Sequence, residues 1–534
     1  MPVHRLDGTP KARIFAYKDE IDRWLEEKLR EREPGPAKGE ASGLRKVIVL
    51  ALAALSIMAV ALLLWRYISS SGGLGGPLTI AVLPFTDLSP AKDQAAWCEG
   101  IAEAILNALA SVKGLQVRNR FSSFLLTAQD DPGRVGRELS VERLLTGSLQ
   151  RMEDSFRIIV KLFDDQRGIL LWSEKYDRKD KDIFLVQDEI ARAVLEILKV
   201  ERPGDKSKPI VRIETGDLGA YNMYLLGRHF WDKRGLNNML KSVEYFQQAI
   251  AIDPQYALAY VGLSDVYSIL ADNLYLSPHE GYPKAREFTR KALEIDGGLA
   301  DALASLAFIK LDNEWDFSGA EKDFKKVLAM SPDNARTRHH YGALLSVLGR
   351  HDEALKEVKL ARNMDPLAPR LRAAAGHFLY FARKYEQALE ELLNARDFDP
   401  THAATYYFLG NVYREMGRYE ESVAQLKTGL GFDARWPMLR TALAITQARA
   451  GAVDESRQVL AELKERSRTE YISAAHLAAV HTALGEKELA FGLLERAFIE
   501  RDTLLIRLNT DPVFDPLRPD PLFAALLKKI GLQR

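Results

Sequence analysis

"GALLSVLGRHDEALKEVKLARNMDP" occupies residues 342–366, and "GHFLYFARKYEQALEELLNARDFDP" occupies residues 376–400. Both stretches begin with glycine, carry alanine at the same two internal positions and end in Asp-Pro. A third stretch, 410–434, follows after the same interval of 34 residues, with glycine or serine at the small positions. Self-similarity at a fixed period of this length indicates an array of repeated units.

Each unit has the pattern of two antiparallel helices. Small residues recur where the helices must approach closely, as at Gly342 and Ala354, and large apolar side chains such as Leu345 and Val358 fill the remaining space. The period and these residue types resemble the tetratricopeptide repeat family over residues 221–500. This resemblance implies an all-α solenoid whose concave face binds a protein or peptide.

The C-terminal end of the array is less regular. Residues 437–468 lack the glycine and proline marks but keep helical periodicity, and residues 471–500 recover the marks in part. We expect residues 501–534 to form a terminal cap that covers the exposed end of the stack.

Basic and aromatic residues dominate the predicted concave face. They favour an acidic partner or a C-terminal carboxylate, because guanidinium groups bind carboxylates in paired hydrogen bonds. A merely solvated groove is the competing interpretation. The predicted partner-binding residues are Arg336, His339, Arg370, His377, Tyr380, Tyr407, Asn411 and Arg414.

A mixed α+β domain is predicted over residues 78–202, with a linker at 203–220. "LTIAVLPF" (78–85) has the continuous apolar run of a buried strand, and residues 143–177 alternate as an antiparallel meander. The predicted order is βαβαβββα. The stretches "IAVLPFTDLS", "WCEGIAEAILNAL" and "DIFLVQDEIA" resemble the TolB amino-terminal domain family, which implies an interaction domain without a catalytic role.

Glu99 and Glu103 lie one helical turn apart in this domain. They could form an acid/base pair, but nothing nearby in the sequence would separate their pKa values. We therefore expect a solvated helix face.

Residues 47–65 are nineteen positions without a charged side chain. At the helical rise they cover about 30 Å, the thickness of a bilayer's hydrocarbon core. A transmembrane helix is predicted at 47–68, followed by a flexible linker at 69–77. Lys and Arg concentrate before the span, so the N-terminus is expected in the cytoplasm and the bulk of the chain in the periplasm of a bacterial inner membrane.

Residues 1–46 hold two short β segments, "VHRL" and "RIFAY", and a helix with Ile21, Trp24 and Leu25 on one face. This hairpin and helix resemble the end of a MerR- or excisionase-type helix-turn-helix, without the two helices that should come first. Either a DNA-binding head precedes Met1, or the head has decayed to a partial remnant. No DNA-reading residue of that family has a position here.

Neither the composition nor the motifs indicate a nucleic-acid-binding surface, an enzyme active site or a metal site. Lys+Arg and Asp+Glu both number 74, so the chain lacks the basic bias typical of nucleic-acid binding. Cys98 is the only cysteine, and an intrachain disulfide is excluded. No nucleophile, zinc or phosphate-loop motif occurs, and His339 and His340 are expected to face apart on the surface. We therefore predict no enzyme activity, metal or cofactor.

Two functions follow from this organisation. The first is a membrane-anchored, non-enzymatic scaffold or sensor that binds a protein partner through its exported domains. The alternative is a membrane-tethered transcriptional regulator whose DNA-binding domain is truncated in this sequence.

Overall fold

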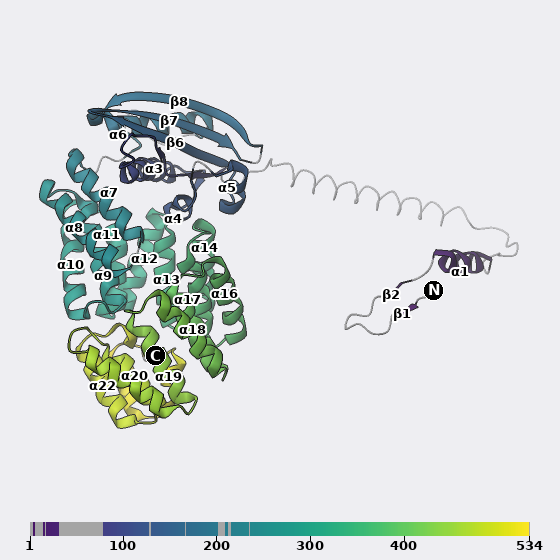
Figure 1. Ribbon diagram of the computed structural model, residues 1–534, viewed down its shortest axis with the longest axis vertical. Helices are drawn as coiled ribbons and strands as arrows, with labels where there is room; N and C mark the ends of the chain where they lie inside the picture. The colour runs from purple at the N-terminus through teal and green to yellow at the C-terminus, as the bar shows by residue number, and fades with distance from the viewer. Residues whose placement is uncertain are drawn as a thin grey trace, which may run out of the picture. The chain divides into compact units, whose positions relative to one another are not determined.

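The protein was analysed as a computed structural model (Figure 1). The chain divides into two units, Met1–Gly76 and Pro77–Arg534. The structure describes residues 4–5, 14–15, 18–30, 78–127, 130–165, 167–200, 209–211, 215–233 and 235–532. The predicted span at 47–68 and linker at 69–77 lie outside these residues. Among the described helices, none is both long and apolar enough to cross a bilayer.

The first unit contains the predicted hairpin strands and helix. Strand β1 (His4–Arg5) pairs antiparallel with β2 (Ile14–Phe15), with His4 opposite Phe15. Helix α1 spans Lys18–Arg30 and begins with acidic residues in its first turn, which complement the helix dipole.

The second unit begins with a sheet of order β5-β3-β6-β7-β8, with the short β4 also paired to β6. Strands β5, β3 and β6 are parallel, and β6, β7 and β8 form the predicted antiparallel meander. The elements are β3 (Leu78–Val82), β4 (Thr86–Asp87), α3 (Ala95–Ala110), β5 (Leu115–Val117), α4 (Arg120–Phe124), α5 (Pro132–Leu139), β6 (Arg143–Met152), β7 (Ser155–Asp164), β8 (Ile169–Lys179) and α6 (Ile183–Ile197).

Strand β3 is apolar except for Thr79, because both of its faces are covered. Ile80 and Val82 join the core beneath α3 and α6, whereas Ala81 and Leu83 pack with α5 on the opposite face. Helix α5 is capped at its start by Asp131, whose side chain accepts from the Arg134 amide. The short elements β4 and α4 were not predicted.

Eight helix pairs follow and curve away from the sheet (Figure 1). A short π-helical turn, η2 (Lys310–Glu314), joins α11 to α12. The pairs are α7 (Leu218–Lys233) with α8 (Leu236–Ile252), α9 (Ala257–Asp272) with α10 (Pro278–Ile295), α11 (Ala300–Ile309) with α12 (Phe317–Met330), α13 (Ala335–Val347) with α14 (His351–Met364), α15 (Pro369–Phe381) with α16 (Tyr385–Phe398), α17 (Ala403–Glu415) with α18 (Tyr419–Phe432), α19 (Pro437–Arg449) with α20 (Val453–Arg466), and α21 (Ala474–Ala483) with α22 (Lys487–Ile499).

The α+β domain and the solenoid share one core. Leu225 of α7 packs against Gly100 of α3, and the Tyr221 hydroxyl donates to the Gly100 carbonyl at 3.3 Å. Gln187 of α6 donates to the same hydroxyl at 3.1 Å. The first repeat therefore covers apolar surface that α3 and α6 would otherwise expose to water.

The C-terminal segment follows the last helix pair, α21 with α22. It also reaches the interior of the solenoid, where Ile506 and Arg507 lie. It consists of η3 (Thr503–Arg507), η4 (Pro512–Leu517) and α23 (Pro521–Lys529). Phe514 and Phe523 are buried in the core that also contains Trp315 from the α12 end of η2. Arg383 at the end of α15 forms two hydrogen bonds to Asp515, at 2.6 and 2.7 Å. The expected cap therefore ties distant repeats together.

Close helix packing at the repeat glycines gives a first prediction. A Cβ at Gly410 would lie 2.5 Å from Leu426 Cγ, whereas one at Gly431 in α18 would meet open space. We expect Gly410→Ala to destabilise the fold by about 1–3 kcal/mol through overpacking. The control Gly431→Ala should be neutral or stabilise by up to about 1 kcal/mol. Urea unfolding followed by circular dichroism measures both. Equal unfolding midpoints for the two variants would contradict the packing argument.

Candidate functional site

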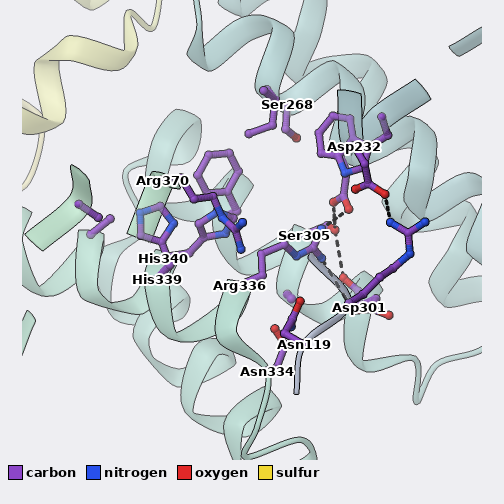
Figure 2. A pocket seen from close by; sticks show the side chains of 18 of the residues that line it. Asn119, Asp232, Ser268, Asp301, Ser305, Asn334, Arg336, His339, His340 and Arg370 are labelled. Carbon is purple, nitrogen blue, oxygen red and sulfur yellow. Dashed lines mark hydrogen bonds and ion pairs between the residues drawn. The ribbon is translucent and has the colours of Figure 1, made fainter. Parts of the chain in front are cut away.

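A cavity of about 1520 Å³ lies inside the curve of the solenoid. We call it the chamber. Its walls come from α7, α9, α11, α13, α15 and α17, from the β5–α4 segment of the α+β domain, and from Ile506 and Arg507 of η3. Figure 2 shows side chains of both domains directed into this space. A cavity bounded by three separate parts of the chain differs from the open groove that the sequence predicted.

One wall of the chamber is built from carboxylates and a paired arginine. Arg336 of α13 forms an ion pair with Asp265 of α9, and its second nitrogen lies 3.9 Å from Asp301. Ser305 donates to Asp265 at 2.6 Å and so fixes this carboxylate (Figure 2). Most of the Arg336 charge is therefore already neutralised within the protein.

A continuous row of planar side chains, which we call the ring row, also lines the chamber. Neighbouring ring centroids are separated by 4.1 to 6.4 Å. Burial, assisted by Arg370, lowers the pKa of His339 to about 3, so this ring is neutral at pH 7. The row runs, in order of contact, through Phe308, His340, His339, Phe378, His377, Phe408, Tyr407 and Trp436.

His339 and His340 correct the sequence analysis. They were expected to face apart on the solenoid surface, but both line the chamber. Both residues are on the inner helix α13, and the His340 ring is tilted against Phe308 of α11 with the ring centroids 4.5 Å apart. In the part of the chain that the structure describes, no three potential metal ligands converge.

Five of the eight predicted partner-binding residues line the chamber: Arg336, His339, Arg370, His377 and Tyr407. Arg370 is 30% exposed and forms an ion pair with Asp365 at 3.2 Å. Figure 2 shows Arg370 beside His339 and His340. That these residues bind a partner stays a prediction.

Tyr380, Asn411 and Arg414 lie elsewhere, in contact with the C-terminal segment. Arg414 is 3% exposed and donates to the Asn411 oxygen at 2.7 Å and to the Tyr380 hydroxyl at 3.2 Å. The Tyr380 hydroxyl donates in turn to Asp511, at 3.1 Å. The segment around Asp511 thus covers this part of the concave face. Repeat periodicity could not reveal the contact because Asp511 lies outside the repeats.

Glu99 and Glu103 are not on a solvated helix face, and that prediction was wrong. Arg120 of α4 contacts Glu99 at 3.1 Å, Glu103 at 2.9 Å and also Asp232 of α7. Arg228 of α7 contacts Glu103 at 3.2 Å. Burial alone would raise the pKa of Glu103, but the charges of Arg120 and Arg228 lower it below its ordinary value. The pair belongs to an ionic contact between the α+β domain and the first repeat.

A second contact fixes the same segment to the middle of the solenoid. Arg118 donates to the Asn363 carbonyl at 2.7 Å, and the Asn119 amide donates to the Met364 carbonyl at 3.0 Å. Asp365 accepts from the Ser122 amide at 2.9 Å and from its hydroxyl at 2.5 Å. The β5–α4 segment therefore spans from α7 to the α14–α15 turn and closes one side of the chamber.

Replacing Asp365 tests whether its contact with Ser122 holds the β5–α4 segment against the solenoid. Its removal leaves the buried Ser122 amide and hydroxyl without their acceptor, so Asp365→Ala should cost about 2–3 kcal/mol of unfolding free energy. Amide hydrogen exchange in residues 118–124 should also become faster. Asp352→Ala is the control, because Asp352 is 82% exposed in its pair with Lys384. Exchange rates in residues 118–124 that match between the two variants would refute the closure.

Comparison with known proteins identifies the repeats. Residues 314–377 and 403–435 match the tetratricopeptide repeat. Putative adenylate cyclase 3 of Rhizobium meliloti (strain 1021) is 32% identical over 288 residues, covering 52% of this chain and 41% of that protein. Transcriptional regulator HilA of Salmonella typhimurium is 24% identical over 174 residues, covering 33% of this chain and 31% of that protein. The chain thus spans less than half the length of these curated relatives.

Solved structures with partial likeness include PilW and YrrB, the second of which is described as a TPR protein. PilW, a type IV pilus biogenesis factor, has a TM-score of 0.34 at 15% identity, covering 42% of this chain and 99% of that structure. YrrB has a TM-score of 0.25 at 21% identity, covering 37% of this chain and 96% of that structure. From the matched segments and the helix pairs that contain them, the solenoid of this chain is built from tetratricopeptide repeats, preceded by an α+β region.

Proposed function

We propose that this chain is a non-enzymatic scaffold that binds a segment of a partner protein in the chamber. The observation that carries the proposal is the chamber itself, at about 1520 Å³ with the ring row along one wall. Small-molecule sites usually occupy about 300–1,000 Å³, so a larger cavity suits several residues of an extended peptide. Planar side chains offer such a peptide large contact area at low entropic cost.

An acidic residue of the partner would form an ion pair with Arg370. This guanidinium lines the chamber and remains 30% exposed although it pairs with Asp365. Arg336 is a weaker candidate because Asp265 and Asp301 already surround it. We therefore expect acidic side chains of the partner to lie toward α15.

Membrane anchoring is part of the same proposal. Residues 47–65 are apolar and follow a Lys/Arg-rich segment, which favours a single-pass inner-membrane protein with a cytoplasmic N-terminus. The TolB-like domain and the repeats would then act in the periplasm as scaffold or sensor.

The relatives supply the competing functions. One relative carries the name adenylate cyclase, but this chain covers only 41% of it, and the chamber has no converging metal ligands among the described residues. The second relative carries the name transcriptional regulator, and the hairpin with α1 resembles the end of a winged DNA-binding domain. A membrane-tethered regulator is therefore the alternative function.

Site-specific photocrosslinking tests partner binding in the chamber. A benzophenone amino acid replaces Ala343, which lines the chamber, or Leu360, which is 40% exposed on the outer helix α14. We expect one partner to crosslink at Ala343 and not at Leu360 in cells that express the full chain. Crosslinking of that partner at Leu360 alone, or at neither position, contradicts the proposal.

Topology is measured separately with alkaline phosphatase fused to the C-terminus, since this reporter is active only after export. The full chain should give an active fusion, and deletion of residues 47–65 should abolish the activity. An inactive fusion to the full chain, with an active cytoplasmic reporter at the same position, would reverse the proposed orientation.

A further inference from the structure

One end of the chamber gathers four polar side chains from three separate elements. Ser268 and Asp272 lie one turn apart on α9, Asp312 is in the π-helical turn η2, and Arg507 is in η3. All four line the chamber. Their charges interact: Asp272 raises the pKa of Asp312, and Arg507 acts to lower the pKa of both carboxyl groups. We call this set the polar end of the chamber.

One of these groups, the Ser268 hydroxyl, is unsatisfied within the described part of the protein. Ser268 is 2% exposed, yet its hydroxyl has no hydrogen-bond partner in the described part of the chain. Asp312, also 2% exposed, accepts a hydrogen bond from the Tyr282 hydroxyl. A buried hydroxyl without a partner is costly, so its direction into a cavity points to a polar ligand.

The charges at this end would not balance if both carboxyl groups were ionised. Two carboxyl groups face one guanidinium, and the nearby His377 is neutral because burial, and then Arg507, lower its pKa. Burial is also the main cause that raises the pKa of Asp272 and brings that of Asp312 to about 8. With one further positive charge beside Arg507, two positive charges would balance two carboxylates, and both carboxyl groups could ionise.

The element that delivers Asp312 is itself unusual. Residues Lys310–Glu314 form a π-helical turn, and Trp315 after it has a left-handed backbone with φ of 60°. Such turns are rare and are frequently found at functional sites. Here the turn places a carboxyl group, rather than an apolar residue, against the polar end.

We propose that the polar end binds the free N-terminus of a peptide, with Asp272, Asp312 and Ser268 accepting from the ammonium and Arg507 donating to the first carbonyl. This proposal rests on peptide binding in the chamber and adds the direction of the chain. A peptide N-terminus brings one positive charge beside a neutral carbonyl, which matches the imbalance. A free amino acid would bring its own carboxylate and leave the imbalance in place.

The first side chain of the peptide would meet the ring row. Arg507, His377 and Tyr407 all line the chamber, and the charge of Arg507 acts to lower the pKa of both His377 and Tyr407. An apolar or aromatic first residue would stack there at little cost in side-chain entropy. Later residues would extend toward Arg370.

Peptide pools test this inference directly. Purified full-length protein in detergent is dialysed against random octapeptides with a free amine and an amidated C-terminus. The same pool is then used with the amine acetylated, and again with the C-terminus as a free acid. Retained peptides are measured by mass spectrometry. We expect acetylation to lower retention about tenfold or more, since it removes the charge that the carboxyl groups need. Freeing the C-terminus should change little.

Variants locate the effect. Asp272→Asn and Ser268→Ala should reduce the preference for the free amine, and circular dichroism checks that both fold. Asp333→Asn is the matched control, because Asp333 lines the chamber beside the α+β domain and not at the polar end. A preference that survives Asp272→Asn together with Ser268→Ala overturns the site.

The outcomes separate this inference from the proposed function. Equal retention of acetylated and free pools refutes N-terminal recognition and leaves peptide binding intact. Retention of acetylated peptides that contain lysine would show that the ammonium comes from a side chain, which also overturns the inference. Retention of no pool by a protein that still crosslinks at Ala343 overturns N-terminal recognition alone.

Discussion

Asp365 holds together the two parts of the molecule that form the chamber. Its carboxylate is fully buried and accepts from both the amide and the hydroxyl of Ser122, which lies on the other domain. Without this acceptor the β5–α4 segment would keep its contacts to the backbone of the α14–α15 turn, from Arg118 and Asn119, but would leave the buried donors of Ser122 unsatisfied. Arg370 also depends on Asp365, because this carboxylate is its ion-pair partner.

The sequence predicted local structure well because local structure follows periodicity. The 34-residue spacing identified the helix pairs, and alternation over residues 143–177 identified the meander. Helix α4 was missed because its five residues are too few to show a helical period. The proposed membrane span remains a prediction, since the structure does not describe it.

The site was harder to predict because its partners are distant in the chain. Glu99 seemed solvated since Arg120 and His229, which pair with it, belong to α4 and α7. Arg414 had the spacing of a groove residue, but a segment beyond the last repeat covers it. Ser268, Asp272 and Asp312 gave no motif, because three elements bring them to one place only after the solenoid curves. Periodicity reports which helices pack together; it does not report what fills the space that they surround.

The bridge between Ser122 and Asp365 joins residues separated by 243 positions. During synthesis from the N-terminus, the α+β domain is complete long before the α14–α15 turn exists, whereas each helix pair needs only its neighbours. Long-range contacts of this kind form late and slowly, and they are also the first to open in a native protein when they involve few residues. Transient release of this bridge, with the repeats still folded, would widen the chamber on the side that the β5–α4 segment closes.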